Sequence, residues 1–301
     1  MIPFHDYSSI TTDDTLRETL QHGNCAYPFA YYLEDIMQFD FHCADWHWHH
    51  ELEFLSVAKG TALCLVGEDK FELPEGCGLF VNSSVLHRYE ATDTAIVPNI
   101  LFAPSLLAPE KSLLYEKYVH PVITSSSPYQ IFDPKIEWQH QILQILDTIY
   151  ALQEDDDRKE LHTVQYLLQL WDILSAHFER SSESGGFRRV NHRQARLQLM
   201  MQYIHDHYSE PITLEEIAAA AAISKSGALD IFQTGIHLPP VSYLIQYRLT
   251  RAAELLHTTE KTVSAIAKET GFSSAGYFCR KFKERYRISP QEYRKEKLGI
   301  E

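Results

Sequence analysis

The sequence predicts a two-domain α+β protein: an N-terminal β-barrel with a helical hairpin, then an all-α domain with two helix-turn-helix units. The 301 residues exceed one typical domain. Strand-like runs fill the first third, and helical periodicity dominates the rest. Residues 1–187 contain 10 Lys and Arg against 29 Asp and Glu, whereas residues 188–301 contain 17 against 12. This charge asymmetry indicates either a nucleic-acid-binding second half or simply an uneven surface.

Six short apolar runs between residues 25 and 103 predict the strands of the N-terminal domain. Glycine, proline and acidic residues separate them, as expected for turns between strands. Many short strands with regular turns are typical of a small barrel or sandwich. The runs are FAYYLEDI, LEFLSVA, TALCLVG, KFELP, GLFVN and AIVPNILFA.

Two amphipathic helices are predicted after residue 134, where apolar residues recur in steps of three and four. The first helix carries Ile142, Ile145, Leu146 and Ile149. A short acidic turn at 155–157 joins it to the second helix, so the two form a hairpin. The hairpin either packs onto the barrel or forms a dimer face, and we expect some of both. The apolar stripe of the second helix is Leu161, Val164, Leu168, Trp171, Leu174 and Phe178.

A small, polar stretch, SSESGG at 181–186, lies where the charge changes sign. Its composition is typical of a flexible linker. The sequence therefore predicts an N-terminal domain over residues 1–180, a linker over 181–189 and a C-terminal domain over 190–301.

The C-terminal domain contains an internal repeat at an offset of about 50 residues. Its copies are ITLEEIAAAAAISKSGALDIFQ (212–233) and KTVSAIAKETGFSSAGYFCRKFK (261–283). Each copy has Ile-Ala, a tight turn, a serine and then a helix with phenylalanine near its end. Gly271 suits the positive φ of a turn, and Ser224 and either Ser273 or Ser274 suit the start of the second helix. The repeat predicts two helix-turn-helix units.

Residues 193–297 resemble the DNA-binding domain of the AraC/XylS family of transcriptional regulators. The matching residues are YRLTRAAELL and VSAIAKETGFSSAGYFCRKFKERYRISPQEYR. The resemblance implies that two recognition helices enter successive major-groove segments. The residues implied to contact DNA are Lys225, Ser226, Arg248, Ser274, Arg280, Lys281 and Lys283.

The first unit departs from that family pattern. Asp230 stands two residues before Phe232, as Arg280 stands two before Phe282. An aspartate is repelled by phosphate, although it can accept a hydrogen bond from cytosine. Ala222 stands where the second unit has Gly271. The second unit should therefore dominate DNA affinity.

The stretch HWHHELEF (47–54) places His47, His49 and Glu53 at even spacing. In a strand these side chains point to one side and can converge, as metal ligands do. The spacing His-x-His-x3-Glu-x6-Gly resembles the metal-binding pattern of cupins, and His87 falls in the position of that fold's further ligand. The resemblance implies that the N-terminal domain is a cupin-like β-barrel that acts as a sensor.

Three interpretations of His47, His49, Glu53 and His87 remain open. They bind an organic effector, they hold a metal ion, or they are buried groups bonded to one another. Family analogy favours effector binding, with no cofactor and a metal ion as an alternative occupant. Aromatic residues in the same region, such as Trp46, either suit a sugar or another ring compound or belong to the barrel core, and we expect at least half of them in the core.

Other features limit the class of protein. The start of the sequence lacks a basic segment followed by an apolar run, so we expect no secretory signal. No apolar run approaches the roughly 20 residues of a membrane span. Five cysteines, an odd number without CxxC, fit a reducing cytoplasm. We expect promoter DNA, a small-molecule effector, RNA polymerase and a second copy of the chain as partners, with no membrane.

The predicted function is a sequence-specific transcriptional regulator, not an enzyme, that is controlled by an effector in the barrel. One alternative is a metal-dependent cupin enzyme that carries a DNA-binding domain. Another is a constitutive regulator with an empty barrel.

Overall fold

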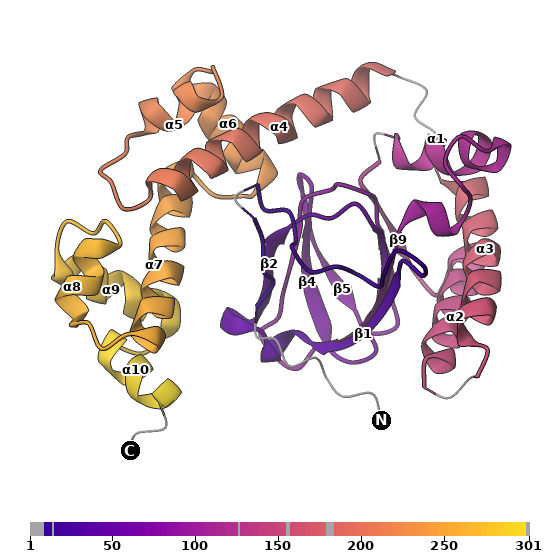
Figure 1. Cartoon of the computed structure of the whole chain (residues 1–301), viewed down its shortest axis with the longest axis horizontal. Coiled ribbons are helices and arrows are strands. Elements are labelled where there is room, and N and C mark those ends of the chain that lie inside the picture. The colour runs from indigo at the N-terminus through magenta and orange to yellow at the C-terminus, as the bar shows by residue number, and fades with distance from the viewer. Residues whose placement is uncertain (1–8, 14, 126, 155–156, 179–183, 299–301) are drawn as a thin grey trace. The chain divides into compact units, whose positions relative to one another are not determined.

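The computed structural model describes residues 9–298, apart from 14, 126, 155–156 and 179–183 (Figure 1). The chain divides into two compact units between residues 192 and 193. The predicted linker, 181–189, lies partly outside the described residues. The described residues resume at Ser184 with helix α4 (Ser184–His207), which continues into the second unit.

The first unit is built on two antiparallel sheets rather than one closed ladder of strands. The five-stranded sheet has the order β1-β8-β3-β6-β9, and the four-stranded sheet has the order β2-β7-β4-β5. The strands are β1 (Phe29–Asp35), β2 (Cys43–His47), β3 (Leu52–Ser56), β4 (Thr61–Val66), β5 (Asp69–Pro74), β6 (Gly78–Val81), β7 (His87–Glu90), β8 (Ile96–Phe102) and β9 (Tyr129–Phe132).

All six predicted strands are present, as β1, β3, β4, β5, β6 and β8. Three further strands were not predicted: β2 (CADWH), β7 (HRYE) and β9 (YQIF). They are short and rich in polar or aromatic residues, so they carry a weak apolar signal. Pairing with longer neighbours stabilises them, as β7 pairs with β4.

The alternation of side chains along β3 separates two cores. Phe54 packs on one face, in a cluster with Phe80, Phe102 and the helical hairpin. Leu55 packs on the other face, with apolar residues of both sheets such as Leu79 and Leu73. Glu53 has the parity of Leu55, so the strand directs it away from the hairpin and toward the inter-sheet core.

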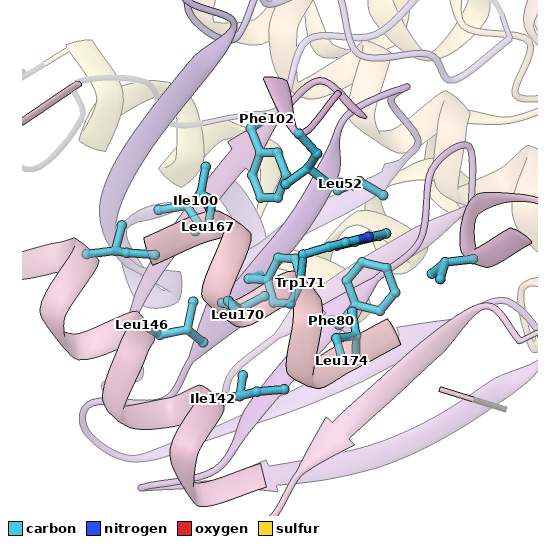
Figure 2. Packing of buried hydrophobic residues seen from close by; sticks show 14 of the residues in the cluster. Leu52, Phe80, Ile100, Phe102, Ile142, Leu146, Leu167, Leu170, Trp171 and Leu174 are labelled. Carbon is cyan, nitrogen blue, oxygen red and sulfur yellow. The ribbon is translucent and has the colours of Figure 1, made fainter. Parts of the chain in front are cut away.

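The predicted hairpin consists of α2 (Glu137–Leu152) and α3 (Lys159–His177) and packs on the five-stranded sheet. Figure 2 shows Trp171 and Leu174 beside Phe80 of β6. The Trp171 and Phe80 rings meet edge-on, with their centroids 6.3 Å apart. The indole N–H of Trp171 donates to the carbonyl of Tyr118. The packing interpretation of the hairpin is therefore correct for this face.

The predicted apolar stripe of α3 does not lie on a single face. Trp171, Leu174 and Phe178 are buried, but Leu161 and Leu168 are 56% and 48% exposed. Steps of three and four follow a period of 3.5, whereas the helix has 3.6 residues per turn, so the stripe drifts around the helix. The helix thus buries one apolar face and exposes part of another.

Short helical segments complete the first unit. They are η1 (Ile36–Gln38), η2 (Asp40–His42), η3 (Pro104–Leu106), η4 (Tyr115–Val119) and α1 (His120–Ile123).

The second unit is helical throughout its described elements. Its core includes Phe232, Phe278 and Phe282, which are fully buried. After α4 come α5 (Leu214–Ala220), α6 (Lys225–Gly235), α7 (Pro240–Thr258), α8 (Val263–Glu269), α9 (Ala275–Tyr286) and α10 (Pro290–Leu298).

Candidate functional site

Four buried side chains, His47, His49, Glu53 and His87, form a cluster that joins the two sheets, and we call it the His/Glu cluster. His47 ends β2 and His87 begins β7, both in the four-stranded sheet, whereas Glu53 lies in β3 of the other sheet. One potential ligand atom from each of the three histidines lies within 4.8 Å of the others. No member is more than 5% exposed.

The four residues converge as predicted, but for a different reason. We expected His47, His49 and Glu53 to share one strand. Instead, β2 ends at His47 and β3 begins at Leu52, so a turn containing His49 separates two strands of different sheets. Convergence comes from that turn and from the pairing of His47 with His87 across β2 and β7.

Backbone carbonyls fix the orientation of all three imidazoles. The Nδ1 atoms of His47, His49 and His87 lie 2.7, 3.1 and 2.9 Å from the carbonyl oxygens of residues 45, 51 and 85. A carbonyl only accepts, so each Nδ1 carries the hydrogen. In a neutral ring this leaves a lone pair on Nε2. For His49 and His87, Nε2 is buried and has no hydrogen-bond partner among the described residues.

Glu53 places a carboxylate beside these rings. Its Oε2 lies 3.2 Å from Nε2 of His87 and 3.6 Å from Nε2 of His49, and it accepts a hydrogen bond from the Tyr89 hydroxyl at 3.0 Å. Burial acts to raise the pKa of Glu53, but His87 and His49 outweigh it and hold that pKa well below its usual range. The cluster therefore contains a buried carboxylate anion.

The pKa values of the imidazoles shift in opposite directions in this environment. Burial, with repulsion from His87, lowers the pKa of His47 to about 3, so its ring is neutral at neutral pH. For His87, burial opposes protonation, but the charge of Glu53 and its contact prevail and raise the pKa. The cluster can thus offer both lone pairs and an anion to an occupant.

The N-terminal segment adds two buried residues that sequence reasoning missed. Glu18 Oε2 lies 3.1 Å from Nε2 of His22, and Nδ1 of His22 lies 2.9 Å from the Tyr32 hydroxyl. The His22 and His49 rings meet edge-on, with their centroids 5.7 Å apart. Backbone bonds hold the segment to Trp48, since the Glu18 amide donates to the Trp48 carbonyl at 2.9 Å. No periodic pattern marks these residues, so only the tertiary structure identifies them.

Both predicted helix-turn-helix units are present in the second unit of the chain. The first is α5–α6 and the second is α8–α9. Ser224 caps α6 and Ser274 caps α9, each accepting a backbone N–H at 3.2 Å. The choice left open between Ser273 and Ser274 is thereby settled for Ser274. The turns have positive φ at Ala222 (53°) and Gly271 (81°).

The structure gives several of the predicted DNA-contact residues other partners. Lys225 forms an ion pair with Glu215, and Lys281 forms one with Glu284 at 2.7 Å. Arg248 donates from Nε to the carbonyl of Tyr208 and from Nη2 to that of Glu210, both at 2.6 Å. Arg248 thus ties α7 to the segment between α4 and α5.

The remaining candidates lie on exposed parts of α6 and α9. Arg280 and Lys283 are exposed on α9, and Arg280 lies over the Tyr277 ring at 5.3 Å. Ser226 is exposed on α6, with its hydroxyl 3.1 Å from that of Ser224. Asp230 on the same helix forms an ion pair with Arg193 of α4. The exposed surface of α9 is therefore more basic than that of α6.

Two family models match the two parts of this architecture. A model of the AraC-like ligand binding domain matches residues 31–171, which include the His/Glu cluster. A model of a helix-turn-helix domain matches residues 217–296, which include α6 and α9. The chain belongs to the AraC family. It is a transcriptional regulator with a ligand-binding domain and a DNA-binding helix-turn-helix domain.

Relatives of this AraC-family regulator match it over most of its length. The HTH-type transcriptional regulator YdeC of Bacillus subtilis is 31% identical over 289 residues, 94% of this chain and 97% of that protein. The HTH-type transcriptional activator RhaS of Escherichia fergusonii is 25% identical and covers 82% of this chain and 86% of its own. The structure of ToxT from Vibrio cholerae covers 88% of this chain at 12% identity, with a TM-score of 0.40. None of the described helices is both long and apolar enough to span a membrane.

Proposed function

We propose that this AraC-family regulator binds a small-molecule effector at the His/Glu cluster and changes its promoter binding in response. The observation that carries the proposal is the cluster itself, because four buried polar residues converge inside the ligand-binding region. Buried polar groups require partners, and a bound effector supplies them. A sugar is a suitable class of effector, since its hydroxyls pair with imidazole nitrogens and carboxylates.

The response requires two states that the effector binds unequally. The continuous helix α4 offers a structural route for this response. Helix α4 begins at Ser184, inside the predicted linker, and its residue Arg193 donates a hydrogen bond to Asp230 on α6. A change in the position of α4 would therefore change the surroundings of the first recognition helix.

We further propose that the regulator is a cytoplasmic homodimer that acts with RNA polymerase. The exposed leucines Leu161 and Leu168 lie one above the other on α3, seven residues apart. A second copy of the same helix would cover them in an isologous contact. Promoter binding then involves one pair of helix-turn-helix units from each chain.

On the DNA side, we propose that α9 supplies most of the affinity, through Arg280 and Lys283. Basic side chains attract phosphate, and an arginine can bind a guanine with two donors. We expect Ser226 on α6 and Ser274, which caps α9, to approach the phosphate backbone of the DNA. Lys225 and Lys281 contribute after exchanging their carboxylate partners for phosphate.

The proposal is tested with the full chain and DNA fragments that it selects from a random pool. Fluorescence anisotropy would measure DNA affinity with and without each of a panel of monosaccharides. We expect one of them to change the affinity, and His47→Ala to abolish this change while basal DNA binding persists. A chain that responds to none supports the constitutive alternative. Chemical turnover of a sugar by the purified chain would support the enzyme alternative.

A further inference from the structure

The first recognition helix, α6, buries one face in the core of its unit and exposes the opposite face. Its buried residues are Ala228, Ile231 and Phe232. Residues at steps of three and four lie together on a helix, and four such residues form the exposed face. They are Ser226, Leu229, Asp230 and Gln233. Because α6 is the second helix of a helix-turn-helix unit, this face is available to base edges in the major groove.

The charges of α6 are balanced within the described residues. The charged residues of this helix are Lys225 and Asp230. Lys225 forms an ion pair with Glu215 of α5. Asp230 forms one with Arg193 of α4, at 3.1 Å. Attraction to phosphate depends on unbalanced positive charge, so the exposed face of α6 suits the bases of DNA better than the phosphates.

Leu229 is the apolar residue of this face, and its side chain is 42% exposed. A single exposed leucine is ordinary on a protein surface, but this one lies on the helix face that meets DNA. In the major groove, the C5-methyl group of thymine is the apolar feature that distinguishes one base from the others. A leucine and a thymine methyl group in contact remove apolar surface from water on both sides.

The internal repeat shows how the two recognition helices differ at this place. At an offset of 50 residues, Leu229 of α6 corresponds to Cys279 of α9, just as Asp230 corresponds to Arg280. Cys279 is partly buried, and its exposed neighbours Arg280 and Lys283 are basic. The face of α9 therefore offers cations to DNA, whereas the face of α6 offers an apolar side chain.

We infer that Leu229 is a specificity-determining residue, which recognises a thymine through its C5-methyl group. The first helix-turn-helix unit thus selects a sequence without adding positive charge. The inference rests on the DNA-binding domain and is independent of the proposed effector.

A protein contact at Leu229 is the competing arrangement. Another protein surface would also remove the leucine side chain from water. Such a contact would be indifferent to the methyl groups of the bases, because it places the side chain on protein and not on DNA. The thymine methyl group therefore separates the two arrangements.

The test uses the full chain and a DNA fragment that it selects from a random pool. Each thymine of this fragment is replaced in turn by deoxyuridine, which removes only the C5-methyl group and keeps every hydrogen-bonding atom of the base. Fluorescence anisotropy should show about fourfold weaker binding at a thymine in the part of the site that α6 covers, the loss expected for one methyl group. This measurement needs no variant of the protein.

Leu229→Ala should bind the thymine and deoxyuridine fragments equally at that position. The fold should tolerate this change, because the side chain is exposed and alanine favours a helix, and circular dichroism verifies it. The salt dependence of DNA binding should stay the same, since no phosphate contact is lost. Cys279→Ala is the matched control at the corresponding place of α9. It should keep the preference for thymine that Leu229→Ala loses.

Three results would overturn the inference. The wild-type chain could bind every deoxyuridine fragment as tightly as the thymine fragment. The preference for thymine could persist in Leu229→Ala, or disappear equally in Cys279→Ala. A changed oligomeric state of Leu229→Ala with an unchanged preference for thymine would assign Leu229 to the protein contact.

Discussion

Arg193 on α4 donates a hydrogen bond to Asp230 on the first recognition helix, with Nη2 3.1 Å from Oδ2. The same Nη2 lies 2.6 Å from the hydroxyl of Thr234, one turn further along α6. Asp230 occupies the position in the first helix-turn-helix unit that Arg280 occupies in the second helix-turn-helix unit. A carboxylate is thus held, with its charge balanced, where the second unit presents a cation.

This ion pair predicts opposite effects of its two members on DNA affinity. Arg193→Gln exposes the charge of Asp230 and should weaken DNA binding by about 1 kcal/mol, or about fivefold in Kd. Asp230→Asn removes the repulsion and should strengthen binding by a similar amount. Fluorescence anisotropy at several salt concentrations would measure both. Weaker binding by Asp230→Asn would show that the aspartate reads a base.

The pair should matter much less for stability. Both side chains are partly exposed, so each substitution should change the free energy of unfolding by only about 0.2–1 kcal/mol. Urea unfolding of the same variants provides this control.

Arg280 should contribute more to DNA binding than its neighbour Lys281. Lys281 already pairs with Glu284, whereas Arg280 is exposed over the Tyr277 ring. Arg280→Ala should cost about 1–3 kcal/mol of binding and relax specificity at one base pair if the arginine contacts a guanine. Competition with base-substituted fragments would test this. Uniform weakening on all fragments would instead assign Arg280 to phosphate.

Arg248 and Arg294 should act as structural residues at matching places beside the two helix-turn-helix units. Each follows a tyrosine, and Arg294 donates to the carbonyls of Leu256 and Lys261 as Arg248 donates to those of Tyr208 and Glu210. Arg248→Ala should lower the free energy of unfolding by about 1.5–3 kcal/mol, because it removes a charged donor from the carbonyl of Tyr208 and leaves that of Glu210 with only the amide of Ile212. Thermal denaturation would measure this. A loss of DNA affinity at unchanged stability would restore Arg248 as a DNA contact.

Substitutions in the two turns should change the stability of the protein in opposite directions. Ala222 has φ of 53°, so Ala222→Gly should stabilise the protein by about 0.5–1 kcal/mol. Gly271→Ala should destabilise it by about 2 kcal/mol or more, because its Cβ would lie 2.6 Å from the carbonyl oxygen of Tyr208. Calorimetry on both variants would compare them. A stabilised Gly271→Ala would contradict the steric argument.

Two neighbouring residues of α3 should separate dimerisation from folding. Leu168 is 48% exposed and Trp171 is 4% exposed. Leu168→Asp should yield a folded monomer if the exposed stripe is the dimer face. Trp171→Ala should cost about 3–5 kcal/mol of stability through loss of core packing. Sedimentation and circular dichroism distinguish the two results, and an unchanged oligomer of Leu168→Asp would place the dimer face elsewhere.

Local patterns predicted much of the fold because they report which face of an element is apolar. The apolar run LEFLSVA and the spacing around Ile142 each identified an element, since such patterns are a local property of the chain. The repeat around Ala218 and Ala267 likewise identified both helix-turn-helix units. The same patterns brought His47, His49 and Glu53 to attention, although the assumption of a single strand was wrong.

Local sequence patterns were sufficient to predict the architecture of each domain, the repeat and the four members of the His/Glu cluster. Which partners these residues have depends on the tertiary structure. Glu18 reaches Trp48 across 30 residues, Tyr89 reaches Glu53 across 36, and Arg248 reaches Tyr208 across 40. Strand register and helix packing set such contacts, because they bring together segments whose local periodicities carry no information about each other.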